Sequence, residues 1–330
     1  MKIATIPKLK YTLAGVLALT VMPTRADTFG SGVNQFNIDF VNIGNAGNAN
    51  DAGAGGGLYS SPYGGVSYNY RMGVTEVAQD WITKATNLGL ANVTAGAWTG
   101  NQPAANITWF HAAAFVNFLN TSTGHQAAYQ LDAGATTLTL WSSAQAWQAG
   151  GENLYRHKDA FYFLPSETEW YKSAFHQNDG VTANYWDYAT ASNSAPTAVV
   201  SGTGAGTAVF NNVTTFPATV DNNGGLSAYG TRGQGGNVWE WQESAFDGVN
   251  DSPSENRAYR DGSWVSPEIS MRSTERLSIT SGEYLDVGFR VASVVPEPTS
   301  VALLGLGAVL FVTRRRRSTV SMASVLTRTL

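Results

Sequence analysis

Apolar residues recur at helical spacing in two stretches of the first half of the chain. Residues 75–88 place an apolar side chain on one helical face at every third or fourth position, and Gly89 supplies a stop. A second helix is predicted after Thr108, where alanine and aromatic residues share one side as far as Gly124. The chain is therefore expected to carry two amphipathic helices before its midpoint.

The strongest local signal for a helix start lies at residues 166–169. Ser166 and Glu169 form a capping-box pattern, in which the hydroxyl accepts a backbone N–H bond and the glutamate reaches back to a second N–H. Trp170 follows on the face that would be buried, and Gly180 is expected to end this third helix.

Alternating apolar positions predict strands over residues 36–41 and 63–72. Residues 42–57 are rich in glycine and asparagine and indicate a loop, and residues 192–212 indicate a surface loop with one short strand. Short strands and tight turns are expected from Tyr229 onward. Helices that come early and strands that come late favour an α+β fold over alternating βαβ units.

The N-terminus has the pattern of a secretory signal peptide over residues 1–26. Three lysines precede an apolar run at residues 11–22, which is short for a membrane span, and small residues follow near Ala26. The mature chain is expected to start near Asp27, with an uncleaved membrane anchor as the alternative. Since no interior linker is marked, residues 27–294 are predicted to form one domain.

The C-terminus resembles a PEP-CTERM sorting signal of Gram-negative bacteria over residues 295–317, followed by a tail at 318–330. Pro296, Glu297 and Pro298 precede an apolar run at residues 301–312 and four arginines, which would hold that run with its C-terminal side in the cytoplasm. The resemblance implies an exosortase-type processing enzyme as a partner and contact with the inner membrane before processing. An ordinary single-span anchor is the alternative, and both place the domain outside the inner membrane.

Composition narrows the range of functions. The formal net charge is −4 and only 13% of residues are charged, so no nucleic-acid partner is expected. The chain has no cysteine, and it therefore has no disulfide, no thiol nucleophile and no thiolate metal ligand.

Six short motifs in register resemble the formylglycine-generating enzyme family, also called the sulfatase-modifying-factor domain. They occupy residues 72–77, 107–115, 163–170, 235–241, 260–264 and 288–292. The resemblance implies a compact, irregular α+β fold similar to C-type lectins, with few short helices and short antiparallel strands. The motif residues expected to act as scaffold are Asn237, Trp239, Glu240, Trp241, Arg260, Trp264 and Arg290.

The resemblance also implies an oxidase that uses copper held by two cysteines. The first matching position in this chain is Ser266, and the second falls near Ser270 or Met271. A serine hydroxyl is a poor ligand for Cu(I), so copper and the oxidase reaction are not expected here. Other family members hold iron through histidines on a separate bundle, but the four histidines of this chain show no such pairing.

Calcium is the cofactor that the resemblance leaves as a candidate. One site would use the carbonyls of Gln234, Gly236 and Val238, and a second would use Asn184 and the carbonyl of Tyr185. The side-chain ligand of the first site falls on a glycine, and the sequence offers no acid between residues 187 and 221 for the second.

These observations favour an exported, non-catalytic binding or structural module of the cell envelope or extracellular matrix. An exopolysaccharide or an envelope protein is the expected partner, with Trp98, Trp141 or Trp147 as candidates to stack on sugar rings. The alternatives are an enzyme with an unrecognised chemistry on the same fold, or residual sulfatase-modifying oxidoreductase activity.

Overall fold

The structure, a computed structural model, describes residues 25–53, 62–93 and 96–296. Among these residues, no helix combines the length and the apolar character that a bilayer span requires. The apolar run at 301–312, the motif residues Glu297 and Pro298, and nearly all of the expected signal peptide lie outside this part of the chain. The first described strand, β1 (Arg25–Phe29), begins just before the expected mature start at Asp27.

Two of the predicted helices start where the sequence indicates. Helix α2 (Trp109–Ser122) begins after Thr108, whose hydroxyl accepts the N–H of His111 at 3.0 Å. Helix α3 (Glu167–Phe175) begins with the complete capping box. It ends earlier than Gly180, because the chain turns back after Phe175 and the carbonyl of this residue accepts the N–H of Trp186.

Helix α1 (Gln79–Asn87) is shorter than predicted, and its expected start at residue 75 is wrong. The backbone before it is extended because the N–H and the carbonyl of Val77 both form hydrogen bonds to distant segments. Its N–H donates to the carbonyl of Phe289 at 2.9 Å, and its carbonyl accepts the N–H of Ala104 at 2.7 Å. Tertiary hydrogen bonds therefore outweigh the helical pattern at these positions.

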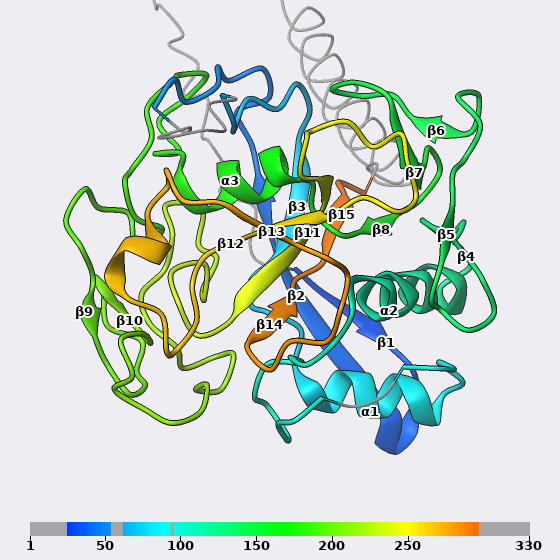
Figure 1. The fold of residues 1–330 in the computed structure, drawn as a ribbon, viewed down its shortest axis with the longest axis horizontal. Coiled ribbons are helices and arrows are strands. Elements are labelled where there is room, and N and C mark those ends of the chain that lie inside the picture. Colours follow the sequence, from blue (N-terminus) through cyan, green and yellow to red (C-terminus); the bar gives the residue numbers. More distant parts are fainter. Residues whose placement is uncertain (1–24, 54–61, 94–95, 297–330) are drawn as a thin grey trace, which may run out of the picture.

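A five-stranded antiparallel sheet runs through the centre of the molecule (Figure 1). Its order is β1, β2 (Phe36–Ile43), β3 (Tyr70–Gly73), β15 (Ala292–Val294) and β8 (Tyr162–Phe163). The strand predicted at 36–41 is confirmed. The strand predicted at 63–72 is mostly wrong, since Gly64 has φ +96° and only the last residues reach the sheet.

A second sheet joins β13 (Leu277–Ile279), β12 (Arg257–Arg260), β11 (Trp239–Ala245) and β14 (Val287–Phe289). Three short pairs complete the described strands: β4 (Gln130–Leu131) with β5 (Leu138–Thr139), β6 (Ala146–Trp147) with β7 (Asn153–His157), and β9 (Thr197–Ala198) with β10 (Thr207–Ala208). The predicted irregular α+β class is confirmed, with parallel pairing of β11 to β14 and of β9 to β10 as the exceptions to antiparallel order.

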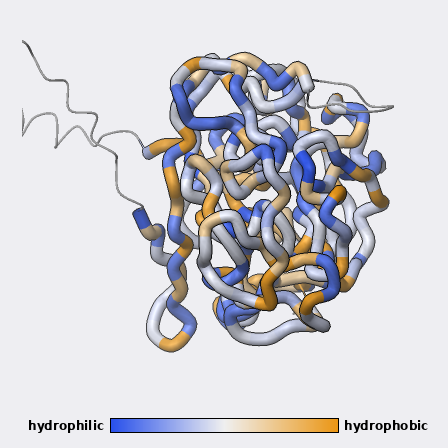
Figure 2. Tube along the Cα trace, turned by 90° about the vertical axis from the view of Figure 1, so that its left-hand side faces the viewer, coloured by the Kyte–Doolittle hydropathy of each residue, from blue (hydrophilic) through white to orange (hydrophobic). Residues whose placement is uncertain are grey.

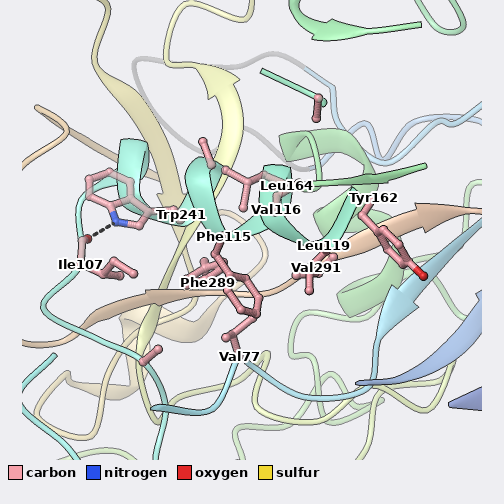
Figure 3. Packing of buried hydrophobic residues seen from close by; sticks show 14 of the residues in the cluster. Val77, Ile107, Phe115, Val116, Leu119, Tyr162, Leu164, Trp241, Phe289 and Val291 are labelled. Atoms are coloured by element: carbon pink, nitrogen blue, oxygen red, sulfur yellow. Dashed lines mark hydrogen bonds between the residues drawn. The ribbon is translucent and has the colours of Figure 1, made fainter. Parts of the chain in front are cut away.

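The main core lies between helix α2 and the two sheets. Phe115 of α2 meets Phe289 of β14 edge-on, with ring centroids 5.8 Å apart, and the Trp241 indole donates to the carbonyl of Ile107 at 2.9 Å (Figure 3). Hydrophobic and hydrophilic residues are interleaved along the coloured part of the trace (Figure 2). This interleaving is typical of a fold built from short segments that each bury a few side chains.

Candidate functional site

The late motif residues form buried ion pairs that hold the sheets and α3 together. Arg290 lies between β14 and β15 and makes two hydrogen bonds to Glu240 of β11, at 2.5 and 2.6 Å. Both residues are fully buried. The Trp170 indole donates to the same carboxylate at 2.6 Å. Both Glu240 oxygens are therefore used within the scaffold.

A second buried cluster, of one glutamate and two arginines, joins α3 to the neighbouring chain segments. Glu167 accepts from Arg260 at 2.7 Å and from two nitrogens of Arg276 at 2.7 and 2.8 Å. Charge-assisted forks of this kind fix orientation as well as distance.

The remaining scaffold residues shape the turn before β11. Asn237 adopts φ +73°, its side-chain oxygen accepts the N–H of Ala218, and its carbonyl accepts the N–H of Trp264. Trp239 packs edge-on against Tyr259 at 5.0 Å.

The positions that match the copper-binding cysteines converge around Gly262. A Cβ on this glycine would lie 3.5 Å from Ser266, 3.4 Å from Ser270 and 3.1 Å from Met271. The Ser266 hydroxyl is 7% exposed and lies in a network with Ser263. Met271 is 1% exposed and belongs to an apolar cluster with Tyr188, Ala208 and Phe210. One buried thioether beside serine hydroxyls does not supply the pair of soft ligands that a Cu(I) site requires.

A polar cleft of about 340 Å³ opens elsewhere, between the β6–β7 hairpin, the start of α3 and the segment before β3. In Figure 1, α3, β6 and β7 all lie in the upper part of the view. Tyr68 and Trp147 supply aromatic walls, with ring centroids 5.4 Å apart and the rings nearly perpendicular. Polar side chains of Asn153, Ser166 and Asn250 are among the groups that line the rest of this cleft.

The floor of the cleft is a buried arginine whose hydrogen bonds are satisfied. Arg156 is 1% exposed, and it bonds to Glu169 at 2.8 and 3.0 Å and to Glu243 at 2.6 and 2.8 Å. Its guanidinium also lies 3.7 Å from the centre of the Phe163 ring and 5.3 Å from that of Trp147. The arginine therefore supports the aromatic wall, and its charge is already taken by protein carboxylates.

The protonation of these groups follows from their contacts. Burial favours the neutral carboxyl, but Arg156 outweighs it and lowers the pKa of Glu169. Burial raises the pKa of Glu243 and, together with the nearby Glu169, that of Tyr68. The Tyr68 hydroxyl is therefore neutral and donates to Glu169 at 2.7 Å.

The three tryptophans considered for sugar stacking have different environments. Trp147 is half-buried at the cleft, and its indole N–H is bound to the carbonyl of Ala149 at 2.9 Å. Trp141 is only 8% exposed and donates to the carbonyl of Ala128, so its expected exposure is wrong. Trp98 is half-buried and meets Trp264 edge-on at 5.3 Å. Only Trp147 therefore combines access with a polar cleft.

Comparison with known families assigns most of this fold. The family described as the Sulfatase-modifying factor enzyme 1-like domain matches residues 65–295. The chain belongs to this family. A PEP-CTERM protein-sorting motif matches residues 294–317, which marks the chain for export and for processing by an exosortase-type system of Gram-negative bacteria. Comparison with curated proteins gives no match.

Solved structures agree with the assignment at the level of the fold. Treponema denticola variable protein 1 has a TM-score of 0.56 and 21% identity, over 82% of this chain and 99% of that one. CarF has a TM-score of 0.55 and 19% identity, over 78% of this chain and 99% of that one. At these identities the likeness concerns the fold alone.

The first calcium set that the sulfatase-modifying-factor family implies has a buried carboxylate beside it, because Asp261 accepts the N–H of Gly236 at 2.6 Å and its other oxygen has no hydrogen-bond partner among the described residues. The carbonyl of Gly236 accepts the N–H of Val238 at 3.1 Å. The nearby Glu240 is fully paired. Calcium at this first set stays a prediction from the resemblance, since a hard cation requires several free oxygens and negative charge.

The side-chain ligand of the first calcium set corresponds to Gly233, and the space beside this glycine is filled by Glu76. Gly233 has φ +75°, and a Cβ there would lie 2.6 Å from the carboxyl of Glu76. Glu76 is fully buried and accepts hydrogen bonds from the amides of Asn223 and Asn237 at 2.9 Å. Burial, with a contribution from Glu240, raises the pKa of Glu76 to about 8.

The structure also places a carboxylate beside the second set. Asp179 lies on the same exposed turn, and its carboxylate accepts from Thr182 at 2.5 Å and from Asn184 at 2.6 Å. These two bonds lower the pKa of Asp179 and keep it ionised. Asn184, the carbonyl of Tyr185 and Asp179 are the groups that would hold the ion.

The cleft residues were missed from the sequence, apart from Trp147. Glu169 was recognised only as a helix cap, although it also binds Arg156 and Tyr68. The one local signal was the Gly150–Gly151 pair, since both glycines have positive φ and form the tight end of the β6–β7 hairpin.

Proposed function

We propose that this exported chain is a non-catalytic binding module of the cell envelope or extracellular matrix, and that its cleft beside Trp147 holds a neutral glycan. The observation that carries the proposal is the combination of two aromatic walls with several polar side chains in one cleft. Ligand sites usually combine apolar faces with a few fixed polar groups.

The aromatic walls suit a sugar ring, which presents C–H groups on its faces and hydroxyls on its edge. Trp147 is held in place by its own N–H bond and by Arg156 beneath it. Little side-chain freedom would therefore be lost on binding, which favours affinity. Ser166, Asn153 and Asn250 lie within the same lining and could bond to ring hydroxyls.

The charges of the cleft argue for an uncharged ligand. Arg156 is committed to Glu169 and Glu243, and Glu152 stands exposed at the rim. Two acidic residues, Glu169 and Glu152, line the cleft against one arginine, so its net charge is negative whether or not Glu243 is protonated. Acidic glycans and phosphates would be repelled, since the described residues that line this cleft include no free cation.

The test uses the full chain in a detergent without a sugar headgroup, so that the detergent cannot occupy the cleft. Isothermal titration calorimetry with neutral hexasaccharides (cello-, manno-, malto- and xylo-oligomers) should detect binding, whereas an oligoglucuronide should not bind. Trp147→Ala should abolish the signal, and Trp98→Ala should retain it. Absence of binding across the neutral panel, or equal binding by Trp147→Ala, would overturn the proposal.

The non-catalytic part of the proposal rests on the region around Gly262, where Ser266 and Met271 stand at the cysteine positions. The full chain is incubated with a cysteine-containing sulfatase-type peptide, copper and oxygen, and the peptide is examined by mass spectrometry. No aldehyde product is expected. Formation of the aldehyde would show that the chain is an oxidase.

A further inference from the structure

A second lobe of about 340 Å³ adjoins the cleft beside Trp147. Tyr68, Trp147 and Ala149 line both lobes, so these residues form the threshold between them. Beyond the threshold the walls are mostly apolar, with Tyr70, Phe163, Val294 and Val295. The described residues that line this second lobe are all uncharged, which matches the uncharged ligand argued above.

The far wall of the second lobe is the start of the sorting signal. The PEP-CTERM match begins at residue 294, and Val294 and Val295 both line the lobe. Val294 is the last residue of β15, where it pairs with Tyr70 and donates its N–H to the carbonyl of Phe161 at 3.0 Å. The fold therefore fixes the beginning of the signal against the same cleft that carries Trp147.

We propose that one glycan chain runs through both lobes and covers the start of the sorting signal at Val294 and Val295. Ligand binding and access to this segment then exclude each other. The inference rests on the proposed glycan function and extends it to the region where the chain is processed. A ligand of several sugar units is required, because it must occupy the first lobe, cross Trp147 and reach Val295.

Because the chain has no cysteine, a single introduced thiol can report on access to this segment. Val295 is 39% exposed, and Val265, at 41%, is a matched reporter that lines neither lobe. Val295→Cys and Val265→Cys are made in the full chain, and each is alkylated with N-ethylmaleimide in the sugar-free detergent. Calorimetry on the same samples shows whether the neutral hexasaccharide is bound.

The saturating hexasaccharide should slow alkylation of Val295→Cys several-fold and leave Val265→Cys unchanged. The added change Trp147→Ala should remove the protection. If the hexasaccharide binds but both thiols react at their original rates, the inference is overturned and the glycan function remains. If no member of the panel binds, the proposed function fails and this inference fails with it.

Discussion

Trp170 donates its indole hydrogen to Glu240 over 2.6 Å, which connects the start of helix α3 to strand β11 across 70 positions of sequence. The same carboxylate receives Arg290 from the junction of β14 and β15. Three sequence motifs therefore meet at one buried group. A change of one partner would therefore leave the others unsatisfied.

Removal of the Glu240 charge should be far more costly than removal of the indole donor. Glu240→Gln leaves Arg290 buried without its counter-ion, which should lower the free energy of unfolding by about 3–5 kcal/mol. Trp170→Phe keeps the ion pair and should cost about 1–3 kcal/mol. Urea unfolding measures both, with Glu268→Gln as the control, since its partner Arg272 is exposed. Equal losses in the two buried variants would contradict this ranking.

The elements that local residues determine could be predicted from the sequence. The capping box of α3 depends on Ser166 and Glu169, which lie three positions apart, and the cap of α2 depends on Thr108. The start of α1 could not be predicted, because Val77 is held by Phe289 and Ala104. Hydrogen bonds to distant segments leave no trace in a local pattern.

The cleft was predictable only in part for the same reason. Trp147 was recognised as a candidate for its residue type alone. Its neighbours Tyr68, Arg156 and Glu243 come from separate parts of the chain and meet only in the folded domain. The family motifs mark the scaffold, and this cleft is lined mainly by residues outside them, with Ser166, Thr168 and Glu169 as shared members.

Stability should depend on the protonation of Glu76. Its folded pKa of about 8 lies above the ordinary value of 4.5, so the folded state binds the proton more tightly than the unfolded chain. This contribution is present at low pH and is lost as the pH rises through 8. Glu76→Gln mimics the protonated carboxyl and does not titrate. The difference in unfolding free energy between this variant and the unchanged protein should therefore shift in favour of the variant by a few kcal/mol between pH 5 and pH 9, at about 1.4 kcal/mol per pKa unit.

The measurement is the difference in unfolding free energy between the two proteins at each pH, which isolates Glu76 from other titrating groups. The Asn223 side-chain oxygen has no partner among the described residues, and rotation of its amide would let it accept from the glutamine. A difference that does not change between pH 5 and 9 would show that Glu76 titrates normally.

Tyr68 should contribute to glycan binding through its ring and not through its hydroxyl. The hydroxyl is turned to Glu169, which also receives Arg156 and the N–H of Ser166. Tyr68→Phe should therefore leave the affinity for a neutral hexasaccharide nearly unchanged, whereas Tyr68→Ala should weaken it about tenfold, or about 1.4 kcal/mol. Calorimetry measures the affinity of each variant for the hexasaccharide. Equal weakening of this affinity by both variants would assign the contribution of Tyr68 to its hydroxyl.

Gly233 should not tolerate a side chain, because its Cβ would overlap the Glu76 carboxyl at 2.6 Å. Gly206 is the matched control, with φ +67° against +75° and no heavy atom within 4 Å of the position that a Cβ would take. Gly206→Ala should cost about 1 kcal/mol from the positive φ alone. Gly233→Ala should cost about 1–3 kcal/mol more from overpacking, and equal losses in urea unfolding would remove the steric argument.

Calcium should bind at the turn that carries Asp179, Asn184 and the carbonyl of Tyr185. One ionised carboxylate on an exposed turn gives a weak site, so we expect a Kd of about 0.1–1 mM, in the range of extracellular modules. Millimolar calcium should raise the Tm, and a chelator should reverse the shift. Asp179→Asn removes the only carboxylate of the set and should abolish the shift, whereas Asp159→Asn, at another exposed position, should keep it. An unchanged calcium response in Asp179→Asn would place the ion elsewhere, since the turn would then retain no anionic ligand.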